Sequence, residues 1–212
     1  MDKRIIKTKK NLKDTVVLLL AEKPFDQIAV TEICRVSSTS RVTFYSHFAD
    51  KYDLLEEMFQ DMVEWATGHF FRLQRRNNGE GNVAKGWLNV LDSIFALFRE
   101  KQDFLRHAAL EKNPYLYFCF SRHLNRMVLQ YMEACGGAKN SAFTSAQLTG
   151  FICNGLWGFI SESIAAKMSL PQIQEQTGRL LRQVLEGRIL GTPWDGALAA
   201  EIGGERDVSA EH

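Results

Sequence analysis

The sequence predicts an all-α protein of about nine helices, and three observations support this fold class. Apolar residues recur every three or four positions through most of the 212 residues, as amphipathic helices require. No alternating run of apolar and polar residues is long enough to indicate a strand. The prolines Pro24, Pro114, Pro171 and Pro193 each fall at an expected break or helix start.

The first two expected helices lie before residue 37. The first spans about Lys3–Glu22, and Pro24 ends it. Its apolar stripe consists of Leu12, Val16, Leu19 and Leu20. Thr31 is expected to be the N-cap of a short second helix with Ile33 and Val36 on its inner face.

A turn and a third helix follow directly. Ser37, Ser38 and Thr39 interrupt the apolar period, and Ser40 is expected to cap a helix that runs to about His47. Phe44 and Phe48, four residues apart, would form its inner face. The outward positions hold no acidic residue, and their polar groups can all donate hydrogen bonds; they are Arg41, Val42, Thr43, Tyr45, Ser46 and His47. Such a face suits phosphate oxygens and base-edge acceptors in a major groove.

The distribution of charge supports this interpretation. Residues 1–51 carry ten Lys and Arg against six Asp and Glu, whereas residues 52–212 carry sixteen against nineteen. The formal net charge of the whole chain is only +1. A basic N-terminal part on an acidic remainder is the asymmetry expected when one end contacts phosphates, although a solvated lysine face would give the same count.

The remaining helices are expected after Asp50, which would cap a fourth helix that runs to roughly Arg75. Its inner residues are Leu54, Leu55, Met58, Phe59 and Met62. After this helix we expect a loop over 75–82 and five further helices. They lie around 87–98, over 104–110, over 114–134, over 143–167 and from Pro171 onward. The eighth is apolar almost all round, which predicts burial on two sides.

The run from Ile33 to Phe48, with TFYSHF and then DKYDLL, resembles the DNA-binding signature of the TetR family of bacterial transcriptional regulators. The resemblance covers about Lys3–Phe59. It implies a helix-turn-helix domain over 1–50, an effector-binding and dimerisation domain over 51–190, and a flexible tail over 191–212. One difference lies in the turn, where the family usually has Ala-Gly-Val. A turn glycine often has a positive φ, so Ser38 is expected to strain this turn.

The resemblance also implies roles for individual residues. Arg41 can pair with guanine O6 and N7, and Val42 can contact a thymine methyl. Lys51 and Thr31, at the starts of two helices, are expected near phosphates. The full predicted DNA-binding set is Thr31, Ser40, Arg41, Val42, Thr43, Tyr45, Ser46, His47 and Lys51. The expected partner is a palindromic operator in double-stranded DNA, and the family's commonest activity is repression.

Aromatic residues are abundant after residue 60. The family's second domain commonly encloses a small-molecule effector, so these rings are expected to line a cavity for an apolar or aromatic molecule. The predicted lining residues are Trp65, Trp87, Phe95, Phe98, Phe104, Tyr115, Phe118 and Trp157. The alternative is that these rings only fill a core.

Small residues recur along one face of the eighth helix, at Gly150, Asn154, Gly158, Ser161 and Ala165. Small side chains permit a close helix crossing, and in this family the last two helices usually form a two-fold bundle. A homodimer through Gly150, Asn154, Gly158, Leu180 and Val184 is therefore expected, the alternative being packing within one chain.

An enzyme is not expected. The sequence has no HExxH pair, no GxSxG and no Gly-rich phosphate loop, so neither a metal nor another cofactor is predicted. The carboxylates Glu56, Glu57 and Asp61 are expected on the solvent face of the fourth helix. The four cysteines lack metal-ligand spacing and are expected to be free thiols in a cytoplasmic, non-membrane protein. An adaptor with this fold that no longer binds DNA remains a second alternative.

Overall fold

The computed structural model describes residues 3–104, 113–134 and 143–187, and this part of the chain is helical without a strand. The all-α prediction is confirmed. The expected sixth helix lies mostly outside the described residues, as does the expected tail. The elements are α1 (Lys3–Leu20), η1 (Phe25–Gln27), α2 (Val30–Val36), α3 (Arg41–Tyr45), α4 (Lys51–Asn77), α5 (Val83–Glu100), α7 (Pro114–Ala134), α8 (Ser145–Ala165) and α9 (Leu170–Leu185).

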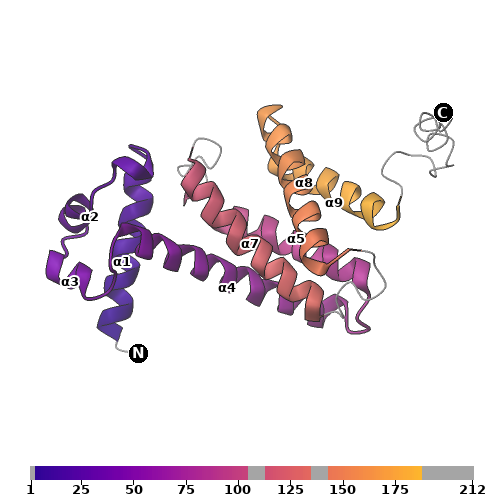
Figure 1. Ribbon diagram of the computed structural model, residues 1–212, viewed down its shortest axis with the longest axis horizontal. Coiled ribbons are helices and arrows are strands. Elements are labelled where there is room, and N and C mark those ends of the chain that lie inside the picture. Colours follow the sequence, from indigo (N-terminus) through magenta and orange to yellow (C-terminus); the bar gives the residue numbers. More distant parts are fainter. Residues whose placement is uncertain (1–2, 105–112, 135–142, 188–212) are drawn as a thin grey trace, which may run out of the picture.

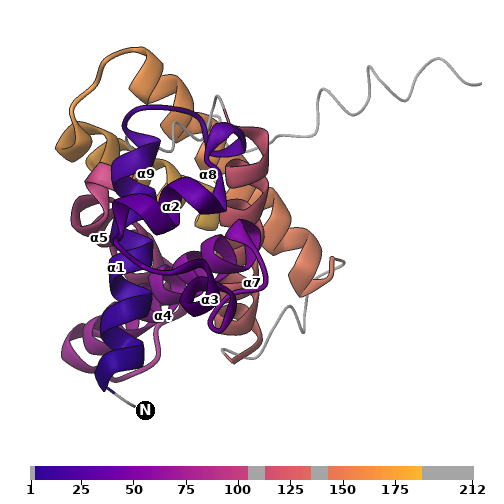
Figure 2. The same ribbon diagram turned by 90° about the vertical axis from the view of Figure 1, so that its left-hand side faces the viewer.

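The helices form two groups that α4 connects. Helices α1, α2 and α3 gather at one end of the molecule, and α4 leaves this group and runs along most of its length (Figures 1 and 2). Helices α5 and α7 pack against α4, α8 packs against α7 and α9, and α9 returns to α5. Helix α4 therefore lies between the first three helices and most of α5 and α7.

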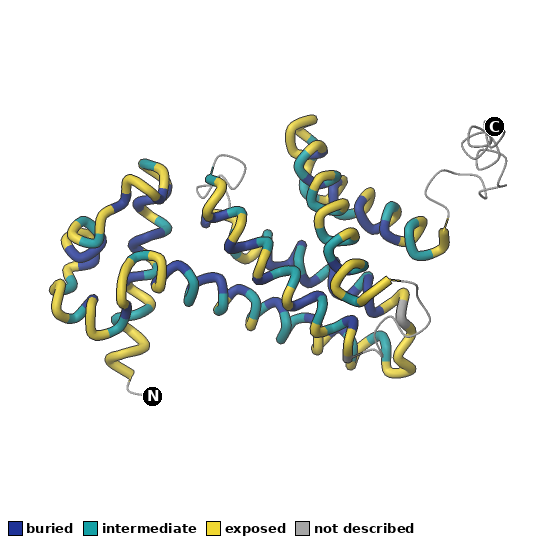
Figure 3. Tube along the Cα trace, viewed as in Figure 1, coloured by how far each residue is buried: buried dark blue, intermediate teal, exposed yellow. Residues whose placement is uncertain are grey.

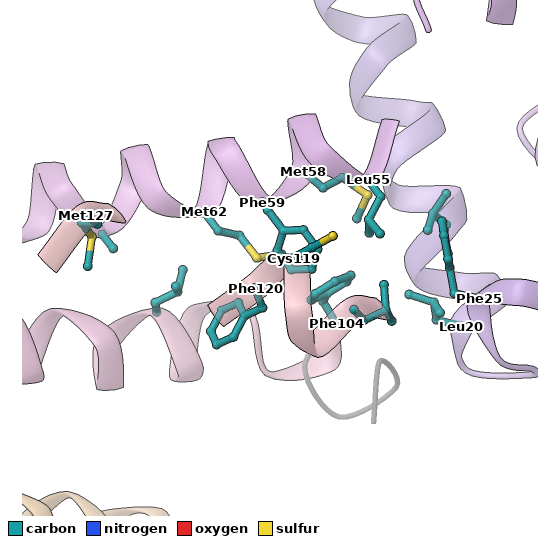
Figure 4. Close-up of a cluster of buried hydrophobic side chains, with 14 of the residues drawn as sticks. Leu20, Phe25, Leu55, Met58, Phe59, Met62, Phe104, Cys119, Phe120 and Met127 are labelled. Carbon is teal, nitrogen blue, oxygen red and sulfur yellow. The ribbon is translucent and has the colours of Figure 1, made fainter. Parts of the chain in front are cut away.

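One buried cluster extends across both groups. The expected stripes of α1 and α4 are all buried, and Figure 3 shows the dark buried faces of these helices turned inward. In Figure 4, Leu20 and Phe25 of the first group lie at one end of the cluster and Leu55 and Met58 of α4 lie beside them. The cluster continues along α4 to Met62 and α7. Helices α1, α2 and α3 therefore share one hydrophobic core with the rest of the described chain, and they are not joined to it by a flexible linker alone.

The start of α4 is held by a reciprocal cap. The Asp50 carboxylate accepts hydrogen bonds from the backbone N–H groups of Tyr52 and Asp53, each at 2.8 Å. In return, the Asp53 carboxylate accepts from the N–H of Ala49 at 2.9 Å. The predicted cap at Asp50 is confirmed, and it fixes the angle at which α4 leaves α3.

Helix α8 differs from the prediction. Within one chain it is buried on one side only, where Thr149, Ile160 and Ser163 face the core. An exposed stripe follows the opposite side, and we call it the α8 stripe: Phe151, Asn154, Gly155, Gly158 and Glu162. No helix in the described part of the chain is long and apolar enough to span a bilayer.

Candidate nucleic-acid interface and effector cavity

The first helix of the candidate interface begins earlier than predicted. Helix α2 has Ala29 as its N-cap, with no side-chain hydrogen bond, so the predicted cap at Thr31 is wrong. The carbonyl of Ala29 accepts from the N–H groups of Glu32 and Ile33 at 3.0 and 3.1 Å, so the first helical hydrogen bonds form before Thr31. Thr31 is instead an exposed residue of the first turn.

The inner face of α2 is only partly as predicted. Ile33 is fully buried, but Val36 is 38% exposed and Cys34 takes the second buried position. The helix is only seven residues long, and it turns Cys34 toward the core. Val36 therefore belongs to the outer surface, beside the turn.

Ser38 adopts the strained backbone that the sequence predicts for the turn, with φ of 53°. The turn is nevertheless well bonded. The N–H of Thr39 donates to the carbonyl of Cys34 at 2.9 Å, and the Asn11 side chain donates to the carbonyl of Ser37 at 2.7 Å. The bond from Asn11 ties the turn to α1, so the surrounding structure supports the unfavourable φ.

Replacing Ser38 by glycine should raise the free energy of unfolding by about 1 kcal/mol, because glycine adopts a positive φ without steric cost. The side chain of Ser38 is exposed, so the substitution removes little packing. Urea denaturation followed by circular dichroism measures the change. Ser40→Ala is the opposing control, since it removes a cap and should lower stability by about 1 kcal/mol. A lower denaturation midpoint for Ser38→Gly would contradict the assignment of strain.

Helix α3 is capped as predicted and anchored by two rings. The hydroxyl of Ser40 accepts from the N–H of Thr43 at 3.0 Å. Phe44 and Phe48 are buried at 0% and 2% exposure, with ring centroids 5.8 Å apart. A helix of only five residues has little stability of its own, so these two rings determine which face it presents.

The opposite face of α3 is open. Arg41, Tyr45 and Ser46 are exposed, and Val42 is 81% exposed. Thr43 and His47 are half-buried at the edges of the same face, and the Ser46 hydroxyl already donates to the carbonyl of Thr43. A valine this exposed gains nothing from the fold of the single chain. The face therefore presents the positive charge of Arg41, the hydroxyl groups of Tyr45 and Ser46, and the apolar side chain of Val42.

Lys51 lies in a different setting from the predicted phosphate site. Its ammonium donates to the backbone carbonyls of Phe25, Asp26 and Ile28, each at 2.9 Å. It also lies 4.9 Å from the centre of the Phe25 ring. Burial lowers the pKa of this ammonium group, although the charge of Asp26 opposes the shift. All three N–H bonds are directed at η1 and its flanks, so Lys51 fastens this loop to the start of α4.

Lys51→Met should lower the free energy of unfolding by about 1–3 kcal/mol, because methionine keeps the stem but leaves three carbonyls without their donor. Lys10→Met is the matched control. Lys10 is exposed on α1 and pairs only with Asp14 four residues on, so its loss should cost less than about 0.5 kcal/mol. Denaturation midpoints compare the two variants. If Lys51 instead contacts DNA, its loss would leave stability unchanged and flatten the salt dependence of DNA binding.

An apolar cavity of about 60 Å³ lies between α5, α7, α8 and α9. Five aromatic rings form much of its wall: Trp87, Phe98, Tyr117, Phe120 and Trp157. Aliphatic residues of all four helices complete it together with Ser121, Asn125, Cys153 and Asn154, and none of the described lining residues is charged. This volume holds a few water-sized spheres, so an aromatic molecule would enter only if the helices move apart.

Three of the eight predicted cavity residues line this space, namely Trp87, Phe98 and Trp157. The other five lie elsewhere. Phe95 and Phe104 are buried in the core, Trp65 stacks on His69, Tyr115 packs on Phe25 and Tyr52, and Phe118 is 59% exposed. The sequence reasoning missed Tyr117 and Phe120. The helical period of α7 could have found them, because Leu124 and Val128 continue the same face.

Side-chain bonds connect α7 to α4 and α4 to α1. The Glu56 carboxylate of α4 accepts from His123 at 2.8 Å and from Arg122, both on α7. The next residue, Glu57, pairs with Lys9 and Lys13 of α1 at 2.5 and 2.8 Å. Glu56 and Glu57 are therefore half-buried and paired rather than solvated as predicted, whereas Asp61 is exposed as predicted.

The titration of Glu56 reflects these bonds. Burial alone would raise the pKa of its carboxyl, but hydrogen bonds from His123 and Cys119 and the charge of Arg122 together lower it. Glu56 is therefore held in the ionised form that these donors require. His123 is 6% exposed and belongs to this connection.

The glycines of α8 face open space. A Cβ atom built on Gly150 or Gly158 would meet no other atom within 4 Å. Asn154 is exposed, whereas Leu180 and Val184 of α9 are half-buried. Close packing within one chain therefore does not explain these glycines. The predicted free thiols are confirmed for Cys34, Cys119 and Cys153, and Cys135 lies outside the described residues.

No group of three or more potential metal ligands gathers anywhere in the described ranges.

Comparison with known proteins agrees with this geometry. Residues 16–58 match the sequence profile of "Bacterial regulatory proteins, tetR family". A 61-residue stretch is 38% identical to the "Uncharacterized HTH-type transcriptional regulator YxbF" of Bacillus subtilis, and it covers 28% of this chain but only 16% of that protein. The likeness to that relative is thus confined to one segment.

Solved structures resemble a much larger part of the chain. A putative TetR-family regulator from Syntrophomonas wolfei superposes with a TM-score of 0.71, covering 88% of this chain and 98% of that one at 13% identity. A TetR transcriptional regulator from Streptococcus agalactiae gives 0.55, with 85% and 96% covered at 20% identity. At these identities the likeness concerns the fold alone.

Proposed function

We propose that this chain, a member of the TetR family of bacterial regulatory proteins by its residues 16–58, is a dimeric, sequence-specific DNA-binding repressor. A small apolar or aromatic effector releases it from its operator. The observation that carries the proposal is the outer face of α3, where Arg41, Val42 and Tyr45 are exposed while Phe44 and Phe48 are buried.

That face has the chemistry of a major-groove contact. The guanidinium of Arg41 can donate to two acceptors of one guanine, and the exposed Val42 can meet a thymine methyl. The hydroxyl of Tyr45 and the ring of His47, on the same face, can donate to phosphate oxygens and so position the helix. An adaptor would use the exposed Val42 as a protein contact, so the DNA-binding assay below distinguishes the two functions.

A single unit of this kind contacts only a few base pairs, so the proposed function requires two. The α8 stripe is the proposed centre of the dimer. Its glycines leave open space, and Phe151 is 64% exposed beside them. Pairing two such stripes would bury the ring and give α8 the second buried side that its sequence predicts.

Release of the operator DNA would depend on the side-chain bonds that α4 makes with α7 and with the first three helices. An effector that opens the cavity displaces α7, and α7 holds α4 through Glu56. A tilt of α4 then reaches α1 through Glu57, and it reaches the η1 loop that precedes α2 through the Lys51 contacts. The two recognition helices would no longer match successive major grooves, about 34–36 Å apart. Linkage requires that operator DNA weaken effector binding by the same factor.

Fluorescence anisotropy with DNA from upstream of the protein's own gene tests the proposal. We expect specific binding whose affinity falls steeply between about 50 and 200 mM salt, as phosphate contacts require. A scrambled duplex of the same composition is the control. Equal affinity for both duplexes, or the absence of binding at low salt, would contradict the proposed function.

A further inference from the structure

One residue of the cavity wall carries a buried polar atom that lacks a partner. Among the described residues, the Asn125 Oδ1 is the only buried side-chain nitrogen or oxygen without a hydrogen bond. Asn125 lies on α7 and contributes to the wall of the apolar cavity. An unpaired buried acceptor is costly, so its presence beside a mainly apolar cavity indicates that something else supplies the donor.

The orientation of the amide is determined by its other end. The Asn125 Nδ2 donates to the carbonyl of Ser121 at 2.9 Å. Exchanging the oxygen and nitrogen would set two acceptors against each other, so the oxygen remains the free atom.

Three other polar side chains of the wall are already bonded or neutral. The hydroxyl of Ser121 donates to the carbonyl of Phe118 at 3.0 Å, and the amide of Asn154 donates to the carbonyl of Gly150 at 2.7 Å. Burial raises the pKa of the Cys153 thiol to about 12, which keeps it neutral. A water molecule needs two to four polar partners, so the Oδ1 alone is a poor site for one.

We propose that this cavity selects an uncharged, largely aromatic molecule that carries one hydrogen-bond donor, and that the donor pairs with Asn125 Oδ1. The rings of Trp87, Phe98 and Trp157 accept the aromatic body. The absence of charged side chains among the described lining residues disfavours an ion. The inference rests on the proposed function only for the statement that this molecule is the effector.

Asn125 also lies close to the bonds that connect α7 to α4, so a ligand bound to it can affect α4. Arg122 and Arg126 lie one turn or less away on the same helix, and they bond Glu56 and Gln60 of α4. A ligand that donates a hydrogen bond to Asn125 therefore contacts α7, the helix whose arginines bond α4. The same residue can contribute to both selection and release.

A matched pair of probes tests the selection. Isothermal titration of the full chain, without DNA, compares 2-naphthol with 2-methoxynaphthalene, which has the same ring system but no donor. We expect 2-naphthol to bind wild type about tenfold more tightly, the difference that one neutral hydrogen bond provides. In Asn125→Leu the ratio should fall to about one, because leucine matches the volume but accepts no bond. Gln130→Leu, an exposed amide on the same helix, should keep the wild-type ratio.

The outcomes separate this inference from the proposed function. An equal ratio in wild type and Asn125→Leu, or failure of both probes to bind wild type, overturns the inference whatever the protein does with DNA. The wild-type ratio needs no variant, so a folding defect in Asn125→Leu does not obscure it. If the selectivity is found but 2-naphthol leaves operator binding unchanged, the ligand class stands and the effector role fails.

Discussion

Arg41→Ala should lower operator affinity by about 1–3 kcal/mol for each half-site, and a symmetric dimer loses both contacts. The guanidinium is exposed at the start of α3, on the side opposite the buried Phe44. The variant should also lose its preference at one base pair in each half-site, because the bidentate contact that distinguishes guanine is absent.

Anisotropy titrations with single-base variants of the operator, at several salt concentrations, measure both effects. Arg35→Ala is the matched control, since it removes an exposed positive charge from α2 rather than α3. It should reduce the affinity for all sequences similarly and leave base preference intact. A uniform loss in Arg41→Ala as well would mean that Arg41 contacts only phosphate.

Gly158→Leu should dissociate the protein into monomers and reduce operator affinity by several orders of magnitude. In the proposed dimer a four-carbon side chain would have to fit within a close helix crossing. Within one chain, a Cβ at Gly158 meets nothing within 4 Å, and leucine favours helix over glycine by about 1 kcal/mol or less. The monomer should therefore fold at least as stably as before.

Light scattering measures the mass of each form. Wild type is expected at twice the chain mass of 24.2 kDa and the variant at the chain mass itself. Gly68→Leu, on α4, is the control, because its Cβ would approach only the flexible end of Arg72, at 3.6 Å. A wild-type mass of one chain at micromolar concentration, or an intact dimer for Gly158→Leu, would exclude the α8 stripe as the interface.

Helix positions followed from the sequence because their signals are local. The period of the apolar residues located α1 and α4, and the side chains of Ser40 and Asp50 mark the starts of α3 and α4 by bonding N–H groups two or three residues away. The strain at Ser38 was predictable for the same reason, since a turn constrains its own φ. The exposed face of α3 needed only the spacing of Phe44 and Phe48.

The tertiary structure decided what depends on partners distant in the chain. Lys51 meets carbonyls 23 to 26 residues away, and Glu56 meets α7 at a separation of 66 and 67 residues. No local pattern distinguishes such a group from a solvated one. The sequence therefore predicted Lys51 near a phosphate and Glu56 on the solvent face. The aromatic count indicated a cavity, but which rings line it depends on how α5, α7 and α8 rotate against one another. The unpaired oxygen of Asn125 exists only in that packing, because an exposed asparagine would bond to water.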